Sequence, residues 1–320
     1  MEKAKEVKHI QLYAANLVTN AMWHKFFQQR GRNLQTLKLQ WLDASFNDQV
    51  VEEMATHCQN LRRLKLKLCR QVGVDALDSI TRLTSLEHLS LQIAQTVRSE
   101  RLVNLVRCVG TKIQTLSLEK FIDADDTVLQ AIHHECKALS KLRLSDNDCY
   151  TDAGFTALFT EWQNPPLKFV DVNSTRDVDN SNSNGPEQPN GCASEGLKAL
   201  MAHSGGKLEH LDIASCRHIT HAAFAEAFDG RKMYPCLKEI NISFCNTVDT
   251  VTVAGMFKSC PALKKLVAFG CFNVEDVVVP SGIVLIGVPK AQDAIEQFGN
   301  VFPDVERALG GMAGVVDVAA

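Results

Sequence analysis

One six-residue pattern recurs along most of the chain and limits the folds that the chain can adopt. The pattern is Leu-x-x-Leu-x-Leu, with other apolar residues replacing some of the leucines. Its copies lie at 7–12, 34–39, 61–66, 86–91, 113–118, 139–144, 167–172, 208–213, 237–242 and 263–268. Successive copies begin 25 to 29 residues apart, except for one step of 41 residues. A repeat of this period is typical of a chain in which copies of one small unit stack side by side.

The segments between the copies predict helices. Apolar residues occur there at helical spacing, in the stretches 48–59, 99–110, 125–137, 151–162, 194–206 and 221–230. Ser99, Asp126, Thr151 and Ser194 lie at or next to the start of four of these stretches and are expected to cap the helices. A unit of one short strand and one helix is the leucine-rich repeat. We therefore predict an α/β fold, a leucine-rich-repeat solenoid of about ten repeats, with a curved parallel β-sheet on its concave side and helices on its convex side.

Alternation within each strand predicts which side chains line the concave face. The leucines point into the core, so the residues between them point to the other face of the sheet. Six cations gather in the first half of the repeats: Lys38, Arg63, Lys65, Lys67, Lys141 and Arg143. The chain has a net charge of -3, so this cluster does not follow from a basic composition. Anions occupy the later strands instead, at Asp171, Asp212 and Glu239.

Two interpretations of the six cations stay open. Solenoids bind partners on their concave surfaces, so the cluster is a candidate site for DNA phosphates or for an acidic protein. The alternative is that a solvated strand face carries charge for solubility and to prevent pairing with other strands.

Departures from the repeat divide the chain. We predict a solenoid over 1–273, a C-terminal cap over 274–299 and a disordered tail over 300–320. The long step contains an inserted flexible loop at 173–194, which is rich in Asn, Ser, Gly and Pro. The cap is expected to form two short strands joined at 280–282 and then a helix. Because the repeats begin by residue 7 with no capping module, we expect the chain to be a fragment of a longer protein, or a partner to cover this end.

The spacing of the cysteines follows the repeat rather than a metal site. Three of the eleven lie three residues before a motif and four lie eight residues after the start of one: Cys58, Cys136 and Cys260, then Cys69, Cys216, Cys245 and Cys271. Equivalent positions in stacked repeats predict small buried side chains. No C-x-x-C or paired histidine motif indicates zinc. We expect no metal and no other cofactor.

The sequence contains neither a catalytic motif nor a membrane segment. It has no Gly-rich phosphate loop and no G-x-S-x-G elbow, so we predict that the protein is not an enzyme. Ser215, Cys216, His218 and His221 include a nucleophile and a base, but they lie in a turn between strand and helix. No apolar run is long enough for a membrane helix, and the charged N-terminus is unlike a signal peptide, so an intracellular protein is expected.

Three longer stretches carry a family resemblance beyond the repeat. These are 140–182, 197–230, which includes "LEHLDIASCRHITHAAFAEAFDG", and 267–299. They resemble fungal DNA repair proteins of the Rad-seven type. The phasing of the cysteines also resembles the leucine-rich repeats of F-box-type substrate receptors in ubiquitin ligases.

The resemblance implies a nuclear, non-catalytic scaffold in global-genome nucleotide excision repair that contributes to recognition of ultraviolet-damaged DNA. It implies three protein partners, namely a SNF2-type ATPase with a RING finger, an elongin-C-like adaptor and a cullin. Damaged DNA is a further implied partner, and no membrane is. The alternative is a substrate-receptor subunit of a cullin-based ubiquitin ligase that binds a protein ligand on the concave face. The family supplies no catalytic residues.

Overall fold

The repeats form a single parallel β-sheet in a computed structural model that describes residues 7–15, 17–42, 45–93, 95–175 and 191–288. The sheet has eleven strands, and each pairs with the next one along the chain. The strands are β1 His9–Tyr13, β2 Thr36–Gln40, β3 Arg63–Lys67, β4 His88–Gln92, β5 Thr115–Glu119, β6 Lys141–Arg143, β7 Phe169–Asp171, β8 His210–Asp212, β9 Glu239–Asn241, β10 Lys265–Val267 and β11 Val284–Ile286. The predicted leucine-rich-repeat solenoid is therefore confirmed.

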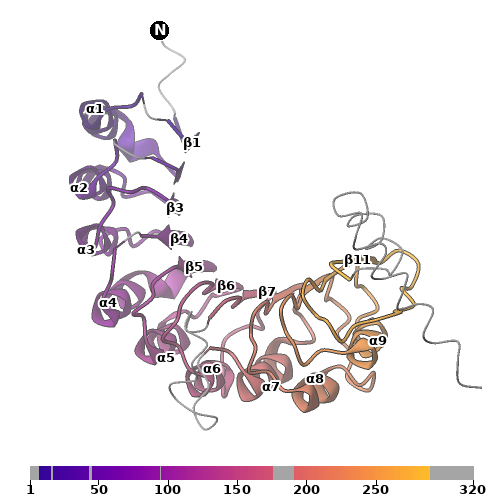
Figure 1. Ribbon diagram of the computed structural model, residues 1–320. Helices are drawn as coiled ribbons and strands as arrows, with labels where there is room; N and C mark the ends of the chain where they lie inside the picture. Colours follow the sequence, from indigo (N-terminus) through magenta and orange to yellow (C-terminus); the bar gives the residue numbers. More distant parts are fainter. Residues whose placement is uncertain (1–6, 16, 43–44, 94, 176–190, 289–320) are drawn as a thin grey trace, which may run out of the picture.

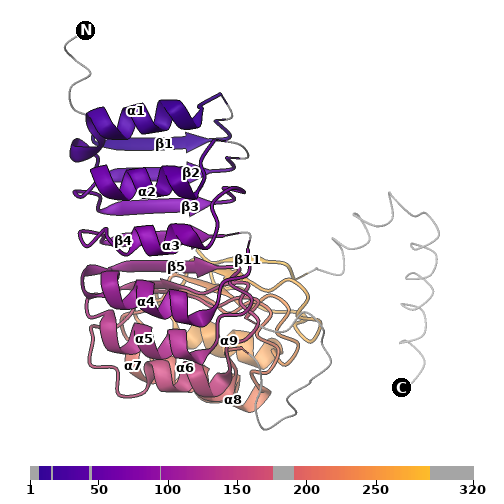
Figure 2. The same cartoon turned by 90° about the vertical axis from the view of Figure 1, so that its left-hand side faces the viewer.

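Helices alternate with the strands and cover the other side of the sheet. They are α1 Asn20–Arg30, α2 Asp48–His57, α3 Asp75–Ile80, α4 Ser99–Val109, α5 Asp126–Glu135, α6 Asp152–Phe159, α7 Ser194–Ser204, α8 His221–Ala227 and α9 Thr250–Ser259. Figure 1 shows the helices on the outside of the arc and the strands on the inside, and Figure 2 shows the first five strands side by side. No helix in the described ranges combines the length and the apolar character that crossing a membrane requires.

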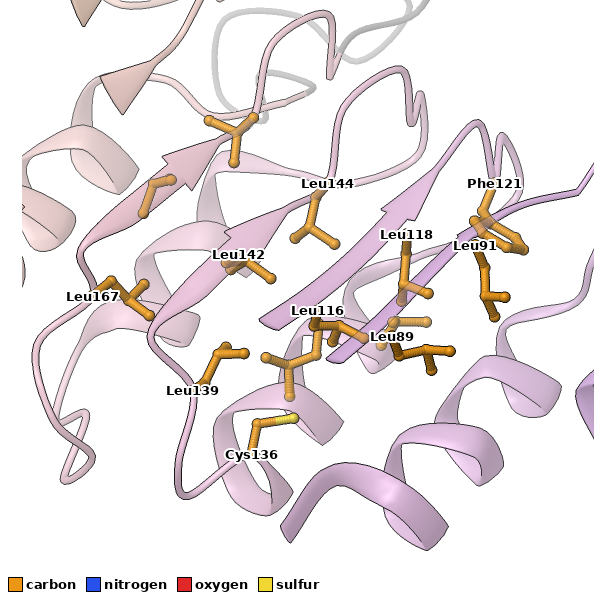
Figure 3. Close-up of a cluster of buried hydrophobic side chains, with 14 of the residues drawn as sticks. Leu89, Leu91, Leu116, Leu118, Phe121, Cys136, Leu139, Leu142, Leu144 and Leu167 are labelled. Atoms are coloured by element: carbon orange, nitrogen blue, oxygen red, sulfur yellow. The ribbon is translucent and has the colours of Figure 1, made fainter. Parts of the chain in front are cut away.

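The core lies between the sheet and the helices, and the repeated leucines fill it. Leu89 and Leu91 on β4 and Leu116 and Leu118 on β5 are at most 2% exposed. Figure 3 shows these side chains between the strands and helices, with Cys136 beside them. Seven cysteines that share two repeat positions are buried, as the spacing predicts: Cys58, Cys69, Cys136, Cys216, Cys245, Cys260 and Cys271.

Polar side chains at the first position of several helices connect one repeat to the next. Asp48 accepts a hydrogen bond from the backbone N–H of Gly73, and Ser99 accepts one from Asp125. The equivalent bonds run from Thr151 to Asp126, from Ala193 to Asp152, from Thr220 to Ser194 and from Glu275 to Thr250. We call this series the polar ladder.

Three of the four residues that were expected to cap helices belong to the polar ladder instead. Thr151 is the N-cap of α6, and its side chain accepts from Gly154 N–H. Ser99, Asp126 and Ser194 are instead the first residues inside α4, α5 and α7. A side-chain oxygen can cap only an N–H group that has no other hydrogen-bond partner. The N–H groups that Ser99, Asp126 and Ser194 cap belong to the following repeat.

The ends of the predicted insertion at 173–194 are held against the solenoid. Cys192 N–H donates to the Thr175 hydroxyl at 3.3 Å, and Gly191 N–H donates to the Tyr150 carbonyl at 2.7 Å. Residues 176–190, which make up most of the predicted flexible loop, lie outside the described residues.

The C-terminal end of the sheet differs from the predicted pair of strands. Residues 274–279 form no strand, and Val284–Ile286 forms β11, which pairs in parallel with β10. Of the two predicted strands, the one before 280 is therefore absent, and the one after 282 continues the solenoid sheet. The helix expected within 289–299 and the tail over 300–320 lie beyond the part that the structure describes. The division into solenoid, cap and tail stays a proposal.

Candidate binding face

The six predicted cations lie on one face of the sheet because the strands pair in register. Lys38 on β2 is aligned with Lys65 on β3, and the same row continues through β4 and β5 to Arg143 on β6. The neighbouring leucines Leu64 and Leu66 are buried on the other face. The alternation that the sequence predicts is therefore present. We call Lys38, Arg63, Lys65, Lys67, Lys141 and Arg143 the concave cluster.

Two members of the concave cluster form ion pairs with carboxylates on other strands. Lys67 forms a salt bridge with Glu119, and each of these side chains is only 12% exposed. The guanidinium of Arg143 donates to the Asp171 carboxylate at 2.6 Å and lies 3.8 Å from Glu119. These partly buried ion pairs engage both cations, so Lys67 and Arg143 have less charge to offer a partner.

The Glu119 carboxylate is the centre of this network. The Ser117 hydroxyl donates to it at 2.6 Å, in addition to Lys67. Burial favours the neutral acid, but the hydrogen bonds from Lys67 and Ser117 outweigh it and lower the pKa of Glu119. Glu119 is therefore a charged structural element that holds Lys67 in place.

The other four cations of the concave cluster, Lys38, Arg63, Lys65 and Lys141, form no salt bridge within the described ranges. Arg63 and Lys141 are exposed, and Lys38 and Lys65 are half-buried. Burial and then the charge of Lys67 lower the pKa of Lys65, with a further contribution from Lys38. Mutual repulsion of this kind marks a positive potential that an anion would relieve.

Sequence reasoning missed a second group of cations along the edge where the strands begin. Lys8, Arg32, Arg62 and Lys112 line an open groove there, together with the amide side chains of three further residues, Asn33, Gln35 and Asn60. Arg62 forms a salt bridge with Glu87 in the same groove. The alternation rule covers only strand interiors. The residues one to four positions before each strand are the signal that would have found this edge, because parallel strands in register bring those segments together.

The later strands carry a different chemistry. Asp171 on β7 is aligned with Asp212 on β8. Burial and then the charge of Asp212 raise the pKa of Asp171, although Arg143 opposes the shift. Beside them the rings of Phe169 and His210 stack with their centroids 4.2 Å apart. The concave face therefore changes from basic to mixed and aromatic at β7.

The candidate nucleophile at the β8 turn is buried, whereas both candidate bases, His218 and His221, are exposed. Cys216 is buried, and its thiol donates to the Val172 carbonyl, whereas His218 is exposed. Burial raises the pKa of the Cys216 thiol well above its usual value, which disfavours the reactive thiolate. Among the described residues no group of three or more His, Cys, Asp or Glu could hold a metal ion.

These observations define a class of protein: a leucine-rich-repeat solenoid with a basic concave face. Within that class the chain is similar to the DNA repair protein rhp7 of Schizosaccharomyces pombe, at 24% identity over 289 residues. This match confirms the resemblance to Rad-seven-type repair proteins. It covers 88% of this chain and 47% of rhp7, so the chain spans about half the length of the curated relative.

A solved structure supports the same fold. The chain matches the crystal structure of the Rad7 and Elc1 complex in yeast with a TM-score of 0.63 and 16% sequence identity. The match covers 83% of this chain and 71% of the chain in that structure. No family model matches the chain.

Proposed function

We propose that the chain is a non-catalytic, nuclear scaffold in global-genome nucleotide excision repair and contributes there to the recognition of ultraviolet-damaged DNA. The observation that carries this proposal is the similarity to a DNA repair protein along 88% of the chain. The solenoid supports it, because stacked repeats offer one long surface on which several partners can bind.

The concave cluster is the proposed binding site within this scaffold. Its four cations without a salt bridge lie on β2, β3 and β6 of the same sheet face, where they would neutralise phosphates or the carboxylates of an acidic protein. Lys67 and Arg143 have a supporting role, because Glu119 and Asp171 hold them.

The proposed partners are an elongin-C-like adaptor, a cullin and a SNF2-type ATPase with a RING finger. The solved complex of Rad7 with Elc1 supports the adaptor, because the solenoid of this chain matches that structure. The same observation supports a second candidate function, a substrate receptor of a ubiquitin ligase. In that function the mixed surface around Asp171 and Phe169 would hold a protein ligand.

Affinity purification from the source cells tests the proposal. The tagged protein would be isolated with and without ultraviolet exposure, and co-purifying proteins would be identified. We expect the adaptor, the cullin and the ATPase in both samples, with more damaged chromatin after exposure. Recovery of the adaptor and cullin with no repair protein would favour the receptor, and recovery of none of these proteins would contradict both functions.

A further inference from the structure

One backbone position, just beyond the strand, has a left-handed conformation in most repeats. The residues at this position are Ala14, Trp41, Leu68, Lys120, Asp146, Ser174, Ser215, Phe244 and Gly270. Glycine, aspartate and small residues tolerate this conformation best. A bulky side chain there is strained, so Trp41, with a φ of 61°, is not explained by local backbone preference.

Burial does not explain Trp41 either. Its side chain is 47% exposed, and the neighbouring Tyr13 is 59% exposed. The centroids of their rings lie 5.1 Å apart at an interplanar angle of 31°. Leu68, at the equivalent position of the next repeat, is 40% exposed. We call Tyr13, Trp41 and Leu68 the aromatic ledge. Large apolar side chains exposed side by side are typical of a binding surface.

The aromatic ledge borders the concave cluster. Tyr13 is aligned with Gln40, and Lys38 lies two residues before Gln40 on the same strand. Lys65 is aligned with Lys38 on the neighbouring strand. Residues two apart on a strand are separated by about 7 Å and adjacent strands by about 4.8 Å, so the rings and the free cations share one surface.

We propose that this surface binds single-stranded or unpaired DNA, with bases stacked on Tyr13 and Trp41 and phosphates held by Lys38, Arg63 and Lys65. The proposal deepens the proposed repair function and rests on it for the choice of DNA. Exposed rings beside a track of cations are what proteins use to bind single strands. A paired duplex would satisfy the cations but would leave the rings without a base to stack on.

Fluorescence offers a direct test, because the chain has three tryptophans and two of them are buried. Trp23 is 3% exposed and Trp162 is 4% exposed, so Trp41 alone is available to a base in solution. We expect a short oligothymidylate to quench the Trp41 emission of the 320-residue chain and added salt to reverse the quenching. A duplex of the same length should bind more weakly and quench less.

Two variants separate the stacking contribution from the charge. Trp41→Gly relieves the left-handed backbone, so the protein should stay folded while its affinity for oligothymidylate falls about 5- to 100-fold. Lys38→Gln with Lys65→Gln should lower the slope of log affinity against log salt by about 1.4. The matched control is Phe244→Gly, at the equivalent position of the β9 repeat with a φ of 61°. It should leave the affinity unchanged.

Three results would overturn the proposal. One is no binding of oligothymidylate, one is equal affinity of Trp41→Gly and the unaltered chain, and one is tighter binding of an acidic peptide than of DNA at the same surface. Each of these would leave the repair function standing if the protein still co-purifies with repair proteins, so the two ideas fail separately.

Discussion

The side chain of Asp152 offers a sharp test of how the repeats are held together. The N-cap residue of α7, Ala193, has no side chain that could accept a hydrogen bond. Asp152, at the start of α6, accepts from the N–H groups of Ala193 and Gly196, both at 2.8 Å, and of Glu195 at 3.1 Å. A carboxylate from the preceding repeat therefore caps α7 across the 41-residue step.

The structure sets the size of the effect. The Ala193 and Gly196 hydrogen bonds are buried, and the Glu195 bond is partly exposed, so water can replace it. An orphaned buried donor costs about 1–3 kcal/mol, so Asp152→Ala should destabilise the protein by about 2–6 kcal/mol. Asp152→Asn keeps the oxygen that serves Ala193 and Gly196, so it should cost about 1–3 kcal/mol.

Urea unfolding followed by circular dichroism would measure these free energies. The matched control is Asp75→Ala. Asp75 also begins its helix, but it is 74% exposed, and Arg101 is its only salt-bridge partner among the described residues. Asp75→Ala should lower the free energy of unfolding by less than about 0.5 kcal/mol. If Asp152→Ala destabilises the protein no more than Asp75→Ala does, the polar ladder does not contribute to stability.

Three further predictions concern the core, the thiols and the concave network. Leu116→Ala should lower the free energy of unfolding by about 2–5 kcal/mol, because Leu116 is only 2% exposed. The control Leu17→Ala should change the free energy of unfolding little, because Leu17 is 92% exposed. Equal effects of the two variants would argue against the assigned register. Burial raises the pKa of Cys58 and Cys136 to about 12. In the native protein a thiol reagent should therefore modify only the accessible Cys108, Cys149 and Cys236. After denaturation the reagent should modify all eleven cysteines. Rapid native labelling of Cys58 would contradict this packing. The pKa of Glu119 is lowered in the folded state, so its contribution to stability is present above the unfolded-state pKa and is lost as the pH falls through the folded-state pKa. Glu119→Gln should therefore destabilise the protein at neutral pH and much less in acid, and a destabilisation independent of pH would contradict the salt bridge to Lys67.

The sequence predicts the repeats and the face of each strand, because one buried leucine pattern fixes both. Arg63, Lys65 and Lys67 point away from the core for that reason. The partner of Lys67 was not predictable. Glu119 lies 52 residues from Lys67, and nothing local shows that its side chain reaches across an intervening strand.

Two other features escaped prediction because they depend on neighbouring repeats or break the period. Ser99 and Asp126 look like helix caps from the sequence, and only the stacked structure shows the N–H groups that they serve. Strand β11 lacks the leucine pattern and a preceding helix. The number of residues from Lys265 to its partner Val284 is also smaller than the spacing between any two successive motifs. A search based on the period therefore stops one strand too early.

The central claim is that the unpaired cations of the concave face serve DNA repair. The most direct measurement is the rate at which ultraviolet photoproducts disappear from untranscribed DNA in cells that lack the chain. These cells would be complemented with the unaltered protein, with Lys38→Gln, Arg63→Gln, Lys65→Gln and Lys141→Gln combined, or with the control Lys198→Gln and Lys232→Gln. We expect slow repair with the fourfold variant at normal protein levels and normal repair with the control. Repair at the normal rate with the fourfold variant would contradict the claim.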